Sequence, residues 1–141
     1  MTAAAVAAKL GGRRALKQQI RSEMDLVALV REGLPVAALD FFVRYLAAGD
    51  LYRIVGSART LQRKRAAGER LSAEESDRLA RVARMFTRAE EALGSEERST
   101  HWLRQANRAL GGARPVDLLD SDAGTVAVER VLGRIEHGVA S

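Results

Sequence analysis

The 141-residue chain contains no cysteine, which excludes a disulfide scaffold, a thiolate metal site and a cysteine nucleophile. Six residues are aromatic: three Phe, two Tyr and one Trp. No stretch approaches the roughly 18 consecutive apolar residues that a membrane-spanning helix needs. The first residues include no basic region ahead of a short apolar stretch, so they do not have the pattern of a signal peptide. We therefore expect a cytoplasmic protein without a membrane partner.

Composition permits a packed core, since 47% of the residues are hydrophobic and 29% are charged. The length suits one ordinary domain or two very small ones. The formal net charge is +5, and it is divided unevenly. Residues 1–70 carry 13 Lys or Arg and 6 Asp or Glu, whereas residues 71–141 carry 10 and 12. The basic first half indicates a nucleic-acid or acidic partner, unless the division is a chance drift of a few charges.

Apolar residues recur with helical spacing along most of the chain. No alternating run of β-branched residues has the length of a strand, so the sequence predicts an all-α fold. We expect residues 1–22 to be a weakly ordered, basic N-terminal segment. The expected helices cover residues 23–31, 35–47, 51–55, 58–67, 72–93, 95–110, 116–119 and 121–137.

Several of these helix ends carry recognisable capping residues. Ser72 and Glu75 have the spacing of a capping box, in which each side chain bonds the other's backbone N–H. Pro35 suits the first turn of a helix because its missing N–H is not needed there. Gly49 is expected to end the helix that begins at Pro35. Asp50 and Asp120 are expected to cap the helices that follow them.

Residues 51–65 have the layout of a helix–turn–helix, with two short helices joined by a tight turn that contains Gly56. Tyr52 stands where a small residue is usual and Gln62 where an apolar one is commoner, which indicates an irregular unit. The alternative is a solvated basic helix with no nucleic-acid role. Arg and Gln side chains suit base edges, and hydroxyls and further cations suit phosphates. The candidate DNA-binding residues are Ser57, Arg59, Thr60, Gln62, Arg63, Lys64 and Arg65.

The second half contains a long ordered series of short motifs. They follow Glu75–Arg81 and are His101-Trp102-Leu103, Asn107-Arg108-Ala109-Leu110-Gly111-Gly112, Pro115-Val116-Asp117-Leu118-Leu119, Gly124, and Val131-Leu132-Gly133-Arg134-Ile135-Glu136-His137-Gly138. In order and spacing, this series resembles the antitoxins of RES–Xre toxin–antitoxin systems, the Xre/MbcA/ParS group. The resemblance spans roughly residues 24–141.

The resemblance implies a bacterial antitoxin that is not an enzyme and needs no cofactor. Its partner would be a RES-domain toxin that consumes NAD or transfers ADP-ribose, and it would neutralise that toxin by steric occlusion. It would also repress its own operon by binding operator DNA, as a homodimer within a toxin–antitoxin complex. The implied organisation is an Xre-like helix–turn–helix domain at residues 23–70, a long connecting helix at 71–94 and a helical toxin-binding domain at 95–141.

The candidate toxin-binding residues lie in the last third of the chain. Trp102 suits an interface anchor or a core position, and Asn107 suits a partner contact or a brace for the Gly111-Gly112 turn. The tail is expected to insert into the toxin's NAD-binding cleft with its carboxylate, or else to be a frayed terminus. The full set is Trp102, Asn107, Arg130, Arg134, Glu136, His137, Gly138, Val139, Ala140 and Ser141.

Two rival functions can be weighed from the residues. For an enzyme, the paired carboxylates Glu74-Glu75, Glu90-Glu91 and Glu96-Glu97 are neighbours that point about 100° apart on a helix, so they do not form an acid–base dyad. His101 and His137 have no ligand partners at metal spacing. A stand-alone transcriptional regulator, whose second half dimerises or senses a ligand, would account for the basic half but not for the ordered C-terminal series.

Overall fold

The computed structural model describes residues 1–138, and all regular secondary structure in this range is helical, with no strand. This confirms the predicted all-α class. The helices are α1 (Ala3–Lys9), α2 (Gly12–Leu16), α3 (Glu23–Glu32), α4 (Val36–Phe42), α5 (Ala48–Ile54), α6 (Ala58–Ala67), α7 (Ala73–Leu93), α8 (Glu96–Arg104), the 3-10 helices η1 (Arg108–Leu110) and η2 (Pro115–Leu118), and α9 (Asp122–Glu136).

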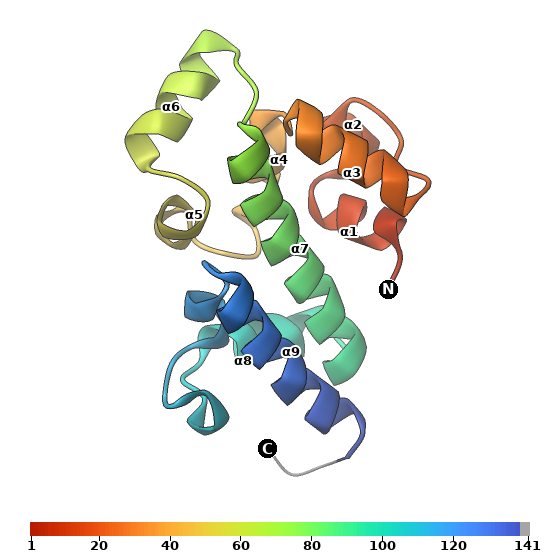
Figure 1. The fold of residues 1–141 in the computed structure, drawn as a ribbon, viewed down its shortest axis with the longest axis vertical. Coiled ribbons are helices and arrows are strands. Elements are labelled where there is room, and N and C mark those ends of the chain that lie inside the picture. The colour runs from red at the N-terminus through yellow and green to blue at the C-terminus, as the bar shows by residue number, and fades with distance from the viewer. Residues whose placement is uncertain (139–141) are drawn as a thin grey trace.

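Helix α7 is the central element of the fold, and the other helices pack around it (Figure 1). It contacts α1, α3 and α5 on the N-terminal side of the chain and α8 and α9 on the C-terminal side. Its apolar face, which includes Leu79, Val82 and Phe86, is buried. The predicted capping box of Ser72 and Glu75 begins the helix. One continuous helix therefore supports both halves of the molecule.

The remaining helices divide into an upper and a lower group. Figure 1 shows α5 and α6 on one side of the upper end of α7, with α1, α2 and α3 on the other side, and α8 and α9 around the lower end. Phe42 of α4 and Phe86 of α7 meet edge to face in the core, with ring centroids 5.2 Å apart. Within residues 1–138, no helix combines the length and apolarity needed to cross a bilayer.

The N-terminal segment differs from the expectation of weak order. Residues 3–9 and 12–16 form α1 and α2, and α1 packs along α7. Val6, Leu10, Leu16 and Ile20 are buried in the common core. Small alanines let α1 approach α7 closely, and the large side chains at four separated positions supply the buried contacts. The segment is ordered because this long-range packing compensates for a weak local pattern.

Two helix boundaries in the first half also differ from the sequence predictions. Helix α4 ends at Phe42, not at Ala47, and Gly49 lies inside α5. Asp50 does not cap a helix; it lies in the first turn of α5, and the N-cap is Ala47. The Asp50 carboxylate is instead engaged by Arg53 and Arg114, and these ionic contacts outweigh the local capping preference.

In the second half, α8 ends at Arg104, six residues before the predicted Leu110. The chain turns extended at Gln105 and re-enters a 3-10 turn at η1. The N-cap of α9 also lies one residue after the predicted position, Asp120. Ser121 is the N-cap of α9, because its Oγ accepts the N–H of Gly124 at 3.0 Å.

Candidate functional site

Helices α5 and α6 form the predicted two-helix unit, joined by residues 55–57. Leu51 and Ile54 of α5 and Leu61 of α6 are buried, and they hold the pair on the core. Ser57 caps α6, since its Oγ accepts the N–H of Thr60 at 3.2 Å, and its hydroxyl lies 3.0 Å from Thr60 Oγ1. The two predicted phosphate-binding hydroxyls are therefore side by side at the start of α6.

The outer face of α6 presents three of the predicted DNA-binding side chains together. Arg59, Gln62 and Arg63 are exposed and recur at i, i+3 and i+4. Arg63 makes one long contact, 3.4 Å from its Nη1 to Glu69 Oε2, and its side chain remains 59% exposed. This face can therefore reach a macromolecular partner without breaking a close internal ion pair of Arg63.

Lys64 and Arg65, by contrast, are engaged within the fold. Lys64 Nζ lies 2.6 Å from Glu75 Oε1, and the two side chains are 13% and 10% exposed. Burial acts to raise the pKa of Glu75, but the hydrogen bonds from Lys64 and Ser72 outweigh it and lower the pKa. Arg65 pairs with Asp40 of α4. These two cations fix α6 against α7 and α4, a role that no local sequence signal indicates.

Two of the predicted toxin-binding residues have structural contacts in the lower half. Trp102 of α8 is half-buried and packs against the core. Asn107 Oδ1 accepts the N–H of Ala109 at 2.9 Å, and the Asn107 carbonyl accepts the N–H of Gly112 at 2.9 Å. Asn107 thus braces the Gly111-Gly112 turn, which is one of the two roles considered for it.

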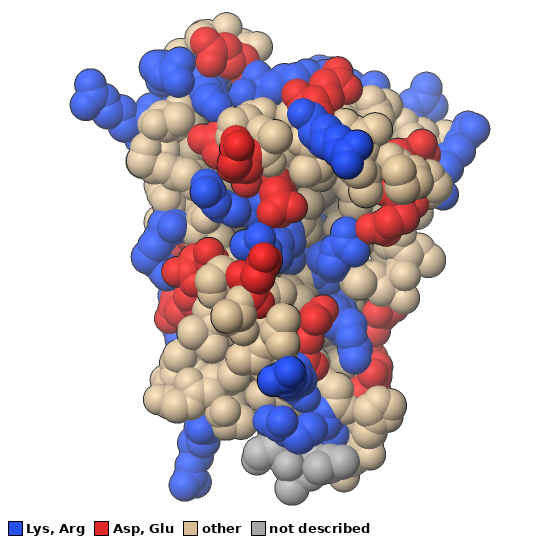
Figure 2. Space-filling model, in the orientation of Figure 1, with Lys and Arg blue, Asp and Glu red and all other residues tan. Residues whose placement is uncertain are grey.

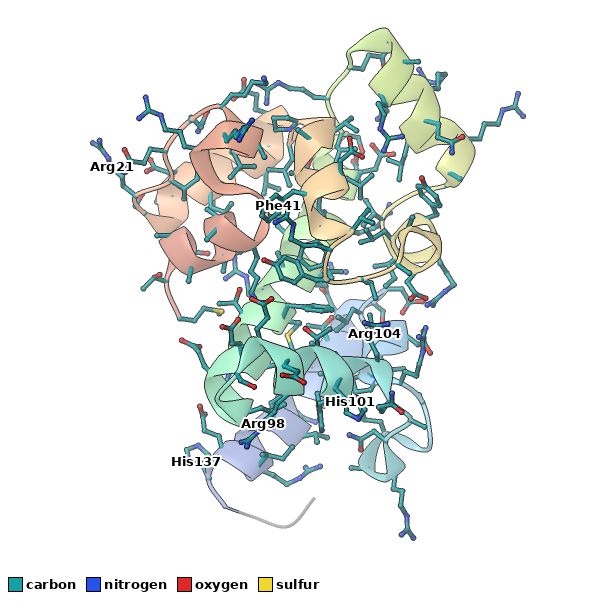
Figure 3. The ribbon with its side chains drawn as sticks, turned by 180° about the vertical axis from the view of Figure 1, so that it is seen from behind. Arg21, Phe41, Arg98, His101, Arg104 and His137 are labelled. Atoms are coloured by element: carbon teal, nitrogen blue, oxygen red, sulfur yellow. The ribbon has the colours of Figure 1, made fainter. Side chains whose placement is uncertain are left out.

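The last turns of α9 carry exposed arginines and a histidine. Arg130, Arg134 and His137 are exposed, as is Gly138. Figure 3 shows His137 at the end of the molecule opposite α6. Glu136 accepts two hydrogen bonds from Arg88 of α7, at 2.7 and 3.1 Å, and these lower its pKa. The predicted site residues Val139, Ala140 and Ser141 lie outside the described residues.

An ionic cluster that the sequence did not predict joins the two-helix unit to the lower half. Arg53 Nη2 contacts Asp50 Oδ1 of α5 at 3.0 Å and Asp117 Oδ1 of η2 at 2.6 Å. Arg114 Nη2 closes the ring, 2.9 Å from Asp50 and 2.8 Å from Asp117. Each carboxylate therefore faces two guanidinium groups, and the cluster ties α5 to η2 across 64 residues of sequence.

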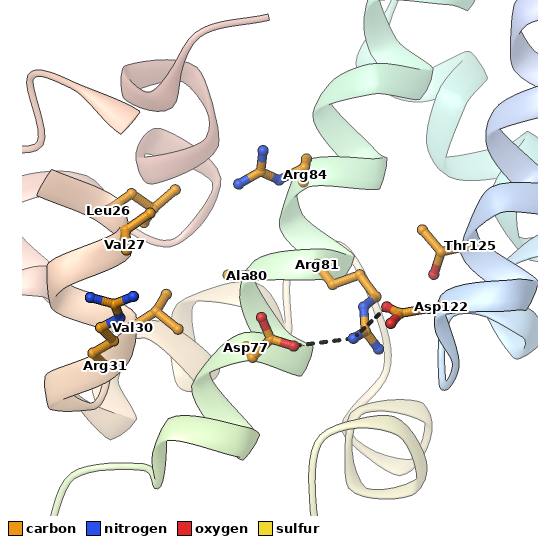
Figure 4. A pocket seen from close by; sticks show the side chains of 10 residues that line it. All are labelled: Leu26, Val27, Val30, Arg31, Asp77, Ala80, Arg81, Arg84, Asp122 and Thr125. Atoms are coloured by element: carbon orange, nitrogen blue, oxygen red, sulfur yellow. Dashed lines mark hydrogen bonds and ion pairs between the residues drawn. The ribbon is translucent and has the colours of Figure 1, made fainter. Parts of the chain in front are cut away.

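A solvent-open groove of about 560 Å³ runs between α3, α7 and α9 (Figure 4). Leu26, Val30 and Ala80 contribute apolar lining. Arg81 of α7 bridges the carboxylates of Asp77, at 3.1 Å, and Asp122, at 3.0 Å. Because Asp122 begins α9, this pairing fixes the start of α9 against α7.

Comparison with known families assigns both halves of the chain. The family model of the antitoxin Xre-like helix-turn-helix domain matches residues 25–84. The model of the antitoxin Xre/MbcA/ParS C-terminal toxin-binding domain matches residues 88–138. The two matches meet inside α7, and neither includes α1 or α2.

Individual relatives agree with these matches. The chain is 33% identical to Antitoxin Xre of Photorhabdus laumondii over 120 residues, which is 82% of this chain and 81% of the relative. It is 30% identical to Antitoxin Xre of Yersinia enterocolitica, with the same coverage of both chains. It is 28% identical over 129 residues to the Prs ADP-ribosylating antitoxin of a Sphingobium species, covering 83% and 81%. The chain therefore belongs to the Xre family of antitoxins, with an Xre-like helix-turn-helix domain followed by a C-terminal toxin-binding domain.

Proposed function

We propose that this antitoxin neutralises a RES-domain toxin that consumes NAD or transfers ADP-ribose, and that it represses its own operon through α6. The observation that carries the proposal is that one fold presents two separate surfaces with exposed arginines. One surface is the outer face of α6, within the helix-turn-helix match, and the other is the end of α9, within the toxin-binding match. The name of the Sphingobium relative supports ADP-ribosyl transfer as the toxin's reaction.

On the DNA side, α6 enters the major groove as the recognition helix. Arg59, Gln62 and Arg63 read base edges, and the hydroxyls of Ser57 and Thr60 contact phosphate oxygens. Lys64 and Arg65, which the sequence suggested as phosphate contacts, are instead positioning residues for α6, because each forms an ion pair within the fold. A homodimer would place two copies of α6 on a two-fold symmetric operator.

On the toxin side, the end of α9 and the residues that follow it cover the toxin's active-site cleft. Arg130, Arg134 and His137 lie on this end and meet acidic groups of the toxin, whereas Glu136 is held by Arg88 and keeps the last turn of α9 on α7. Neutralisation by occlusion requires no chemistry from the antitoxin. The two proposed partners, operator DNA and a toxin acting on NAD, support a cytoplasmic function.

Co-expression with the proposed partner, a RES-domain protein encoded beside this chain where one is present, tests the toxin side. The wild-type chain should copurify with the toxin and preserve cellular NAD and growth. Deletion of residues 138–141, and separately the pair Arg130→Ala and Arg134→Ala, should weaken copurification and restore toxicity. Arg104→Ala, an exposed cation on α8, is the matched control. Full neutralisation by both test variants, or absence of any complex with the wild type, would exclude the proposed surface.

A gel shift on the DNA upstream of the chain's own coding sequence tests the DNA side. The pair Arg59→Ala and Arg63→Ala should abolish the preference for this DNA over a scrambled duplex, since each bidentate pairing with a base contributes about 1–3 kcal/mol of discrimination. Arg130→Ala, at the far end of the molecule, should leave the preference unchanged. An undiminished preference in the α6 variant would refute the assignment of the recognition helix.

A further inference from the structure

The whole net charge of the chain belongs to residues 1–22. This segment contains five Lys or Arg and no Asp or Glu, whereas residues 23–141 contain eighteen of each sign. Both family matches begin after it, at residues 25 and 88. The feature that makes the chain basic thus lies outside the two recognised domains, and the function proposed above does not use it.

The structure divides these five cations into one buried and four exposed groups. Lys9 is buried, with Nζ 2.6 Å from Glu90 and 4.5 Å from the centre of the Tyr45 ring. The others, Arg13, Arg14, Lys17 and Arg21, are exposed. Over residues 1–138, no carboxylate lies within 4.0 Å of Arg13, Arg14 or Lys17. These three charges are not used by the fold.

The cation that follows α4, Arg44, is by contrast engaged within the fold. Its Nε donates to the Phe41 carbonyl at 3.1 Å, and its side chain lines a hollow with Glu96 and Arg104 of α8. The Arg44 guanidinium stacks 3.6 Å from the centre of the Phe41 ring. Phe41 lies directly against the α1–α2 turn, since a Cβ added to Gly11 would be 3.0 Å from Phe41 Cγ. We call the group Arg13, Arg14 and Lys17 the N-terminal cationic patch.

Helix α4 is the element that separates this patch from α6. Both α2 and α6 contact α4. Asp40 of α4 holds Arg65 of α6, and the next residue, Phe41, faces Gly11. Figure 2 shows Lys and Arg side chains, with some Asp and Glu between them, along the upper end of the molecule from the α6 side across to the side of α2 and α3. One helix is about 10–12 Å wide, similar to the roughly 12 Å width of the DNA major groove.

We propose that the N-terminal cationic patch is a second DNA-binding surface, which contacts the phosphate backbone beside the groove that α6 enters. Guanidinium and ammonium groups without internal partners are suited to phosphates, and an interval of one helix width lets the same duplex reach both surfaces. The contact adds affinity that does not depend on sequence. This inference rests on the proposed DNA-binding role of α6 and assigns to the patch the non-specific part of binding.

The test compares salt dependence of binding to two labelled duplexes, the DNA upstream of the chain's own coding sequence and a scrambled duplex of equal length. The test variant carries Arg13→Gln, Arg14→Gln and Lys17→Gln, all exposed positions whose replacement leaves the core intact. The slope of log affinity against log salt should fall by about 0.9 for each phosphate that the variant no longer neutralises. Binding to both duplexes should weaken by a similar factor, roughly 10- to 100-fold near 0.1 M salt.

The control variant removes the same charge from the lower half, as Arg98→Gln, Arg104→Gln and Arg108→Gln, which are exposed on α8 and η1. Figure 3 shows Arg98 and Arg104 in that half. If the patch variant and the control have equal slopes and affinities, the inference is wrong even when Arg59→Ala and Arg63→Ala abolish sequence preference. If the wild type binds neither duplex, the proposed DNA role fails, and this inference fails with it.

Discussion

At the residue scale, two glycines in α9 have opposite environments. A Cβ added to Gly124 would lie 2.0 Å from the Leu118 carbonyl oxygen, whereas one added to Gly133 would meet nothing within 4 Å. The backbone of η2 therefore runs directly against the first turn of α9. Gly124 is required by this close approach, and Gly133 is an ordinary helical position.

These environments predict opposite effects of alanine. Gly124→Ala should lower the free energy of unfolding by about 1–3 kcal/mol, the usual range for overpacking. Gly133→Ala should raise it by about 0.5–1 kcal/mol through lower conformational entropy of the unfolded chain. Urea unfolding followed by circular dichroism measures both. Equal effects of the two substitutions would show that η2 does not pack on α9 at this distance.

Side-chain contacts between residues close in the sequence could be predicted, whereas contacts between helices could not. The capping box of Ser72 and Glu75 was predictable because its partners are three residues apart. The pairing of Lys64 with Glu75 was not, since a contact between two helices depends on how α6 lies against α7. For the same reason, the sequence indicated seven DNA-binding residues on or beside α6 but not which of their side chains the fold would engage.

At the element scale, α1 is the clearest departure from sequence-based expectation. Its seven residues include five alanines, so the local apolar stripe is narrow. Its order comes from Val6 and from Leu10 just beyond it, both buried against distant parts of the chain. Strongly periodic helices such as α7 and α9 were predicted well, because each carries its own apolar face and capping residues.

Substitution of Leu10 tests how much the packing of the N-terminal segment contributes to the stability of the fold. Leu10 is fully buried, so Leu10→Ala should lower the free energy of unfolding by about 2–5 kcal/mol. Ala4→Gly, at an exposed position of α1, should cost about 1 kcal/mol. Chemical denaturation provides both values. A negligible effect of Leu10→Ala would indicate that the segment is weakly ordered in solution, as the sequence alone suggested.

The ionic cluster between α5 and η2 is the second feature at this scale. Burial acts to raise the pKa of Asp50, but hydrogen bonds from Arg114 and Arg53 outweigh it and leave the pKa lowered. The hydrogen bond from Arg114 lowers the pKa of Asp117. Both carboxylates therefore remain ionised at a pH where unfolded aspartates, with a pKa near 4, begin to bind protons.

This cluster predicts how stability depends on pH. A lowered folded pKa stabilises the fold above the unfolded pKa of about 4, and that contribution is lost as pH falls through the folded value. Asp117→Asn should therefore cost about 1 kcal/mol at pH 7, with a difference from wild type that shrinks on acidification. Urea unfolding across the acid range measures this, and the exposed Asp120→Asn is the control. A difference that stays constant down to about pH 2 would contradict it.

At the scale of the whole molecule, the two family matches do not correspond to two separate bodies. One ends at residue 84 and the other begins at residue 88, and both positions lie inside the 21 residues of α7. Arg81 joins α7 to the start of α9, and Arg88 joins it to the end. The sequence indicated two helical units but could not show that a single helix carries both, because the contacts of α7 with α1, α8 and α9 depend on the folded arrangement.

A shared helix also restricts how the chain can change in length. Each residue inserted between positions 84 and 88 would shift Arg88 by about 1.5 Å along the axis of α7 and rotate it by about 100° relative to Arg81. Because α9 pairs with both arginines, it could not keep both ion pairs. Even an insertion of whole turns, such as about seven residues, would separate Arg81 from Arg88 by about 10 Å more, so α7 should not tolerate it, whereas a length change in the loop at residues 105–107 leaves the spacing of these two arginines unchanged.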